Sequence, residues 1–158
     1  MGYQFNDAFT IFKDIEALYA PGTTNFNEAQ TRFKIIDEIV KKCLNWENNG
    51  IDVEIRNDAG FADYCLGAPV KCILEAKREG VYFELPIVDS KPDQVIDIRA
   101  VIKGNKDLEA ALIQVQSYCA AHGVPIGIVS NGHQFIGFLA TRLDGTPPLS
   151  GKCLAFRS

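Results

Sequence analysis

The chain lacks several features that would assign it to a protein class at once. Its 158 residues include only two histidines and one tryptophan, and its five cysteines form no Cys-x-x-Cys pair. No zinc-site spacing is therefore present. No run of about 18 apolar residues occurs, which excludes a membrane-spanning helix, and no signal-peptide pattern opens the sequence. We interpret the cysteines as small, buried, reduced side chains of a cytoplasmic protein.

Positive charge is also in short supply. The 16 Lys and Arg residues face 20 Asp and Glu residues, which gives a net charge of −4. This balance argues against a domain that binds nucleic acid by charge alone. Apolar residues make up 47% of the chain, which excludes disorder over most of its length. Length and composition together predict a single domain over residues 1–158.

The hydropathy pattern predicts helices and strands in a mixed order. Apolar residues recur at helical spacing over residues 5–19, 27–46 and 106–122. Alternating or continuous apolar runs predict strands at 51–55, 61–66, 70–77, 124–130, 135–140 and 153–156. Residues 81–85 are a further candidate strand, inside a stretch at 79–106 that we interpret as a connection or insertion without an assigned role. The order of elements indicates an α/β or α+β fold.

One strand carries a charged pair beside its apolar run. In Leu74-Glu75-Ala76-Lys77, the carboxylate and the ammonium lie two residues apart, so both project from the same strand face. If the turn after the preceding strand is centred on Ala68, Asp63 faces residue 73 and becomes a diagonal neighbour of Glu75. Two carboxylates that converge from adjacent strands suit a hard cation, Mg²⁺ or Mn²⁺.

These residues belong to a longer series in a fixed order. Its pieces are Asn27-Glu28 with Arg32 and Ile36-Asp37, then Phe61-Ala62-Asp63-Tyr64, then Ile73-Leu74-Glu75-Ala76-Lys77-Arg78, then Gln114-x-x-x-Tyr118, then Ser130-Asn131-Gly132. The series resembles the PD-(D/E)xK nuclease superfamily, and within it the N-terminal nuclease domain of type I restriction enzyme R subunits. The resemblance implies a restriction-endonuclease-like α/β fold, with a central mixed β-sheet flanked by helices and a core at about 27–140.

The resemblance also implies a role for each motif residue. Asp63 and Glu75 would hold a catalytic Mg²⁺ or Mn²⁺, and Glu28 would complete the metal shell from the second helix. Lys77 would orient or deprotonate the attacking water and stabilise the phosphate. Gln114 and Tyr118 would contact DNA or brace the site. The implied reaction is metal-dependent hydrolysis of DNA phosphodiester bonds by an endodeoxyribonuclease.

The implied partners are DNA and further protein domains. Relatives of this kind act in prokaryotic restriction and anti-phage defence, fused to a helicase or translocase or to a signalling NTPase. The chain contains no G-x-x-x-x-G-K-[ST] motif for such a motor. We therefore expect the N-terminal part of a larger protein, which acts with attached domains, partner subunits or further copies of itself, and no membrane association.

Each assignment has a structural alternative. Glu75 and Lys77 could form an exposed salt bridge, Asp63 could support a turn, and Glu28 could stabilise a helix N-terminus through its charge. Gln114 and Tyr118 could be structural, and we expect His122 and His133 at the surface. The alternative function is a catalytically silent nucleic-acid-binding or assembly module on the same fold. An RNA nuclease or junction resolvase is a third, weaker hypothesis.

Overall fold

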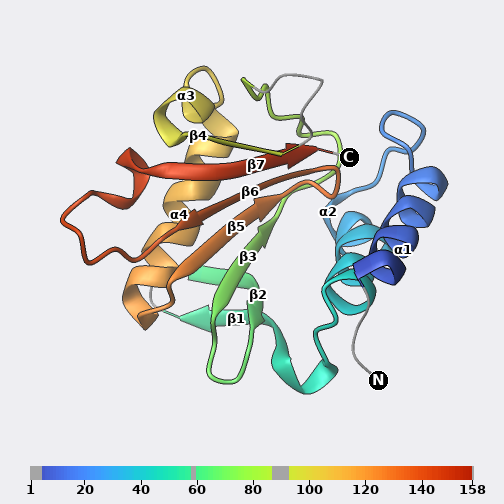
Figure 1. Cartoon of the computed structure of the whole chain (residues 1–158), viewed down its shortest axis with the longest axis horizontal. Helices are drawn as coiled ribbons and strands as arrows, with labels where there is room; N and C mark the ends of the chain where they lie inside the picture. Colours follow the sequence, from blue (N-terminus) through green and yellow to red (C-terminus); the bar gives the residue numbers. More distant parts are fainter. Residues whose placement is uncertain (1–4, 58–59, 87–92, 158) are drawn as a thin grey trace.

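The computed structural model describes residues 5–57, 60–86 and 93–157, and these form a seven-stranded mixed sheet with flanking helices (Figure 1). The strands are β1 Ile51–Asn57, β2 Gly60–Leu66, β3 Cys72–Ala76, β4 Asp93–Asp97, β5 Ile126–Ser130, β6 Gln134–Leu139 and β7 Lys152–Arg157. The α-helices are α1 Phe5–Leu18, α2 Glu28–Thr31, α3 Ile98–Ile102 and α4 Lys106–His122. Two π-helical turns, η1 Arg32–Ile36 and η2 Ile39–Cys43, extend α2, so residues 28–43 form one helical segment.

The strands follow the order β1-β2-β3-β5-β6-β7-β4 across the sheet. Strands β3 and β5 pair in parallel, whereas the other neighbouring pairs among the described strands are antiparallel. A parallel pair needs a long crossover connection. Helix α4 is part of the crossover from β3 to β5, and it ends at Gly123, whose left-handed φ of 64° suits a helix C-cap.

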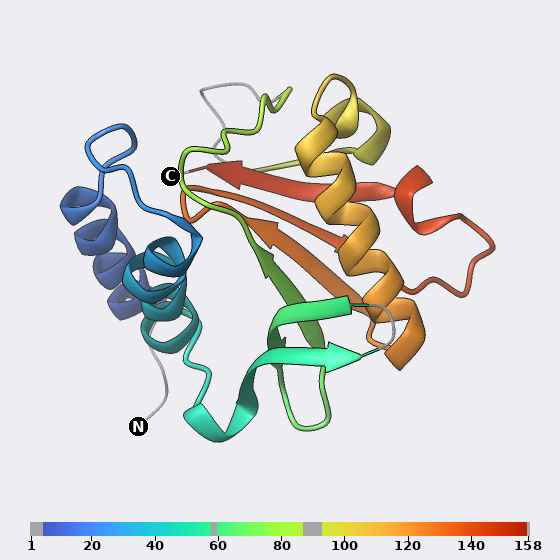
Figure 2. The same ribbon diagram turned by 180° about the vertical axis from the view of Figure 1, so that it is seen from behind.

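Helix α4 covers one face of the sheet. Figure 2 shows it lying across the strands, and its buried residues Leu108, Leu112 and Val115 pack in one cluster with residues of several strands. That cluster includes Ile73 of β3 and extends to Cys153 of β7. The principal core therefore lies between α4 and this face.

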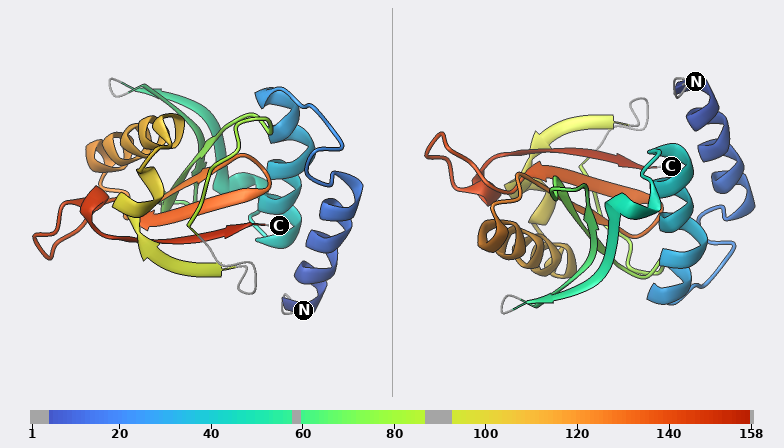
Figure 3. Two further views of the ribbon diagram at one scale, coloured as in Figure 1. Left: turned by 90° about the horizontal axis from the view of Figure 1, so that it is seen from above. Right: turned by 90° about the horizontal axis from the view of Figure 1, so that it is seen from below.

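The other face of β2 and β3 is covered by the helical segment 28–43. Its Ile36 and Val40 pack with Tyr64, Leu66 and Leu74, which alternate along the strands with the residues that face α4. Helix α1 lies on the outer side of this segment, as both views in Figure 3 show. The N-terminal helices thus sit beside the strands that carry the candidate motif.

The structure confirms the predicted α/β fold with a mixed sheet, and most predicted elements lie within two or three residues of their observed bounds. The prediction for 106–122 matches α4 at both ends. Residues 81–85 are not a strand, and β4 and α3 were missed within the stretch interpreted as a connection. Part of that stretch, 87–92, and residues 58–59 between β1 and β2 lie outside the described residues.

The sheet extends beyond residue 140, the end of the core that the resemblance implies. Strand β7 pairs with β6, and β4 pairs with β7, so residues 93–97 and 152–157 complete the sheet. Cys153 and Ala155 are buried in the principal core. All five cysteines are buried and free, as predicted. Among the helices of the described residues, none is long and apolar enough to span a membrane.

Candidate active site

Strands β2 and β3 bring Asp63 and Glu75 together. The ladder pairs Leu66 with Cys72, Cys65 with Ile73 and Tyr64 with Leu74. This register, continued by one position beyond the last ladder pair, aligns Asp63 with Glu75, and the charge of Asp63 acts on the Glu75 carboxyl. The predicted diagonal arrangement is wrong, because the turn is centred on residue 69 instead of 68. A shift of one residue in the turn centre moves each partner by two positions, which leaves both side chains on the same face.

Glu75 is a buried carboxylate, with only 5% of the residue exposed. Burial, and after it the negative charge of Asp63, raise the pKa of its carboxyl from the ordinary 4.5 to a net value of about 7. The hydrogen bond and the positive charge of Lys77 act in the opposite direction. The site therefore concentrates negative charge in a poorly solvated place, an arrangement that favours a bound cation.

Lys77 lies just beyond β3 and contacts Glu75 directly. Its Nζ donates a hydrogen bond to Oε1 of Glu75 over 2.8 Å. Its backbone N–H donates to the carbonyl oxygen of Ser130 over 2.7 Å, which continues the pairing of β3 with β5 beyond Ala76. The parallel neighbour strand thus holds the backbone at the position where the ammonium group meets the carboxylate.

Asp63 uses both of its carboxylate oxygens. Its Oδ2 accepts a hydrogen bond from the backbone N–H of Ala76 over 2.7 Å, which ties β2 to the end of β3. Its Oδ1 lies 3.4 Å from Nη1 of Arg32 in the helical segment 28–43. The same Nη1 lies 3.0 Å from Oε1 of Glu54 on β1. The sequence identifies Arg32 only as a member of the motif series, and it assigns no role at the site to Glu54.

Glu28 stands apart from the two strand carboxylates. It is exposed in the first turn of α2, after the N-cap Asn27, and its charge is a further cause of the raised pKa of Glu75. Within the part of the chain that the structure describes, no group of three or more His, Cys, Asp or Glu side chains is placed to hold a metal ion. The structure thus brings Asp63 and Glu75 together, and Glu28 acts on Glu75 through its charge.

Gln114 and Tyr118 project from α4 toward the β1–β2 hairpin. Gln114 donates through Nε2 to the carbonyl oxygen of Phe61 over 3.2 Å, and the Tyr118 hydroxyl lies 3.5 Å from the carbonyl oxygen of Ile55. Tyr118 is buried, and its ring stacks on His122. Both contacts fit a bracing role for the β1–β2 hairpin, which carries Asp63. Burial leaves the Tyr118 ring little surface for DNA.

The turn between β5 and β6 builds a buried polar network behind Lys77. The Asn131 side chain accepts from the backbone N–H groups of His133 and Gln134 and donates to the carbonyl oxygen of Val81. His133 is buried, which corrects the expectation of a surface residue, and its Nε2 lies 3.7 Å from Oε1 of buried Glu79. Glu79 in turn accepts from Thr24 over 2.6 Å.

This network joins three segments that are distant in the sequence. Glu79 follows the motif strand, its carboxylate also accepts from the backbone N–H of Phe26, and its own N–H donates to the Thr31 hydroxyl. The start of the helical segment 28–43 is thereby fixed to the end of the motif strand. Only the Asn131-Gly132 turn signal hinted at this network in the sequence.

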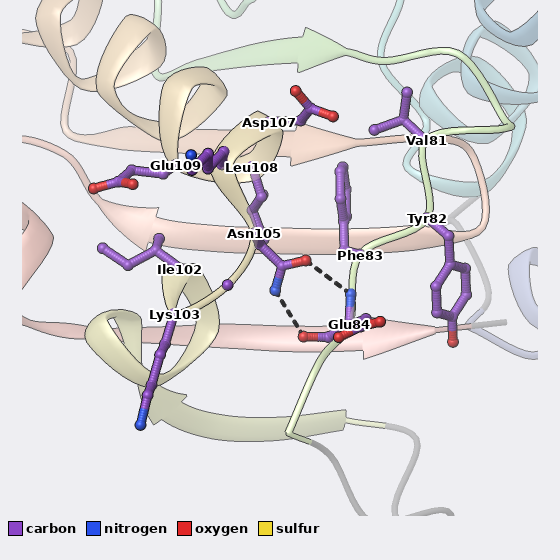
Figure 4. A pocket seen from close by; sticks show the side chains of 12 residues that line it. Val81, Tyr82, Phe83, Glu84, Ile102, Lys103, Asn105, Asp107, Leu108 and Glu109 are labelled. Carbon is purple, nitrogen blue, oxygen red and sulfur yellow. Dashed lines mark hydrogen bonds between the residues drawn. The ribbon is translucent and has the colours of Figure 1, made fainter.

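A cavity of about 650 Å³ lies elsewhere, between residues 81–84 and the start of α4 (Figure 4). The Asn105 side chain crosses its floor and exchanges hydrogen bonds with both backbone groups of Glu84. Asp63, Glu75 and Lys77 are not among its lining residues. The cavity is therefore distinct from the candidate active site.

Comparisons of the chain with protein-family models, with curated proteins and with solved structures gave no match. The functional interpretation consequently depends on the geometry of Asp63, Glu75 and Lys77 and on the chemistry of these groups.

Proposed function

We propose that this chain is a Mg²⁺- or Mn²⁺-dependent endodeoxyribonuclease domain that hydrolyses DNA phosphodiester bonds. The observation that carries the proposal is the proximity of the Asp63 and Glu75 carboxylates on adjacent strands, with Glu75 buried and its ammonium partner Lys77 at 2.8 Å. A buried carboxylate beside a second carboxylate lowers the stability of the fold, so such a pair is expected mainly where a function requires it. Such groups are typical of sites that bind hard divalent cations.

The residues present fit a divalent metal. Asp63 and Glu75 supply oxygen ligands. The pKa of Glu75 is raised first by burial and then by the negative charge of Asp63, and a cation bound between the carboxylates would offset both effects. These two carboxylates would hold the ion, and the charge of Glu28 would favour its approach. Bound there, Mg²⁺ would stabilise negative charge on the phosphate and make water a better nucleophile.

The chain's own residues supply the remaining functions. The Lys77 ammonium group has three N–H donors and no acceptor, so it suits a phosphate oxygen on which negative charge builds up. Its bond to Glu75 holds it beside the carboxylates. The Asp63 bond to the backbone N–H of Ala76 fixes the spacing of the two strands, and Gln114 braces β2 from α4.

The proposed context is prokaryotic restriction or anti-phage defence in the cytoplasm. A net charge of −4 gives this domain little attraction for DNA of its own. Attached domains, such as a helicase, a translocase or a signalling NTPase, or additional subunits would therefore deliver the DNA and control the activity.

The test is cleavage of supercoiled plasmid in Mg²⁺ or Mn²⁺. Wild-type protein should nick the plasmid, and Glu75→Gln and Lys77→Ala should each reduce the rate at least about 100-fold, because each removes a group that acts on the reacting phosphate. Glu47→Gln and Lys71→Ala make the same charge changes at exposed positions and should leave the rate unchanged. Equal rates in all five proteins would refute the proposal.

A catalytically silent nucleic-acid-binding or assembly module is the second candidate function. It is favoured by the internal pairing of the site, because Arg32 already contacts Asp63 and Lys77 already contacts Glu75. This candidate predicts DNA retention in a gel-shift assay without nicking, and equal retention by Glu75→Gln.

A further inference from the structure

Arg32 occupies a position between two carboxylates from two different strands. Its Nη1 lies 3.0 Å from Oε1 of Glu54 on β1 and 3.4 Å from Oδ1 of Asp63 on β2. Its guanidinium carbon lies 5.2 Å from the centre of the Tyr64 ring, within cation–π range. The Arg32 side chain is only 16% exposed. The guanidinium group is therefore held in place by three neighbours.

The two carboxylates differ in their surroundings. The Asp63 side chain is 14% exposed, whereas the Glu54 side chain is 69% exposed. Glu54 has a left-handed φ of 54°, which is unfavourable for a non-glycine residue within a strand. The regular pairs of β1 with β2 on either side of it join Val53 to Tyr64 and Ile55 to Ala62. The distorted residue thus sits across from Asp63.

Arg32 consequently competes with any cation at Asp63. The Asp63 Oδ2 atom is engaged by the backbone N–H of Ala76, and Arg32 contacts the remaining oxygen. A divalent ion bound at Asp63 would lie within a few ångströms of the guanidinium charge, and like charges at such a distance in a partly buried site repel strongly. The 3.0 Å contact gives Arg32 a second carboxylate partner, Glu54. Arg32 can therefore pair with Glu54 without leaving the site.

We propose that Arg32 is a resident counter-ion of the metal site, which neutralises Asp63 in the metal-free protein and is retained by Glu54 when a divalent cation displaces it. The proposal rests on the proposed function, because it assumes a cation at Asp63 and Glu75. It adds a regulatory property: metal affinity is set by the partition of Arg32 between two carboxylates. Lys77 differs, because its position next to Glu75 has no second carboxylate partner among the ion pairs of the described residues.

The experiment is calorimetric titration of Mn²⁺ into the metal-free chain and its variants. Arg32→Gln should bind Mn²⁺ at least about tenfold more tightly than wild type, because the competing charge is gone. Glu54→Gln should bind several-fold more weakly, because Arg32 then has Asp63 as its remaining carboxylate partner. In the Arg32→Gln background the Glu54→Gln effect should shrink markedly, since Glu54 acts mainly through Arg32.

Two variants serve as controls. Arg32→Lys retains the charge and should stay near the wild-type affinity. Lys41→Gln removes the same charge at an exposed position of the same helical segment, more than two turns away, and should change the affinity less than about twofold. If circular dichroism shows that Arg32→Gln does not fold, the other two variants provide the test. Glu54→Gln should then bind Mn²⁺ more weakly than wild type, and Arg32→Lys should bind it with nearly the wild-type affinity.

The outcomes separate the two proposals. Wild-type Mn²⁺ binding that is lost in Glu75→Gln but unchanged in Arg32→Gln would overturn the counter-ion role and leave the metal site standing. Binding in Arg32→Gln alone, with none detected in wild type, would support the counter-ion role in its strongest form. No binding in any folded variant would overturn both proposals.

Discussion

The buried carboxylate of Glu75 makes a specific prediction about stability and pH. Its pKa is about 7 in the folded chain against an ordinary 4.5, chiefly because of burial and then because of Asp63. Between these two values the folded state binds more protons than the unfolded state. The free energy of unfolding should therefore be highest at low pH on account of this group and should fall as the pH rises from about 4.5 to about 7.

The magnitude follows from the two pKa values. Their difference corresponds to about 3 kcal/mol when the carboxyl is ionised in both states. Roughly 2–3 kcal/mol of that penalty should develop between about pH 5 and pH 8, because near pH 5 the folded state is still largely protonated. Glu75→Gln is neutral and of nearly the same shape, and its side-chain oxygen can still accept a hydrogen bond from Lys77. The variant should thus be more stable than wild type at pH 8, with a much smaller difference at pH 5.

The assay is urea denaturation of both proteins in EDTA at several pH values. The quantity of interest is the difference between variant and wild type, because other titrating groups contribute equally to both and cancel. With Mg²⁺ in place of EDTA at pH 8, the stability difference should change sign, so that wild type becomes more stable than Glu75→Gln. The reason is that a bound cation stabilises the ionised carboxylates of the wild-type protein. A difference that is constant from pH 5 to pH 8, or a Glu75→Gln protein that is less stable at pH 8, would refute the reasoning.

Two further predictions concern the packing and the helix start near the site. A Cβ at Gly127 would lie 2.5 Å from Cγ1 of Val115, so Gly127→Ala should lower the free energy of unfolding by about 1–3 kcal/mol, whereas Gly80→Ala, with open space around it, should change it by less than about 0.5 kcal/mol in the same urea titration. Asn27→Ala removes the capping box with Gln30 and should cost about 1 kcal/mol; Asn27→Asp, which can still cap, should cost clearly less, and equal losses in both variants would contradict a capping role.

The elements that the sequence predicted well are those whose burial is one-sided and local. Helix α4 alternates buried and exposed positions at helical spacing and ends at a left-handed glycine, so its bounds are visible in the pattern. Strand β4 was missed because it lies at the edge of the sheet, where Val95 is 65% exposed and little burial shapes its sequence. Its pairing with β7 joins segments more than 50 residues apart, which a local pattern does not reveal.

In the candidate site too, local features were predictable from the sequence and long-range contacts were not. Glu75 and Lys77 lie two residues apart at the end of one strand, and Asp63 lies on the preceding strand, which a short turn joins to it. Strand geometry alone therefore predicts that the three side chains lie close together. The register was two positions off because it depends on the turn centre, which sequence gives only to within a residue. The sequence predicts that Gln114 and Tyr118 share one helix face. It does not predict their backbone acceptors, which lie on β2 and β1.

The roles of Arg32 and Glu54 lay beyond sequence reasoning for a physical reason. Their contact joins a helix to a strand 22 residues later, and it depends on a left-handed residue in β1 that no glycine, asparagine or proline signals. An unfavourable φ of this kind persists only where surrounding contacts over-determine it. Here those contacts are the ladder pairs on either side and the Arg32 guanidinium. The distortion and the ion pair therefore support each other, and replacing Arg32 should loosen the backbone at Glu54 as well as the charge at Asp63.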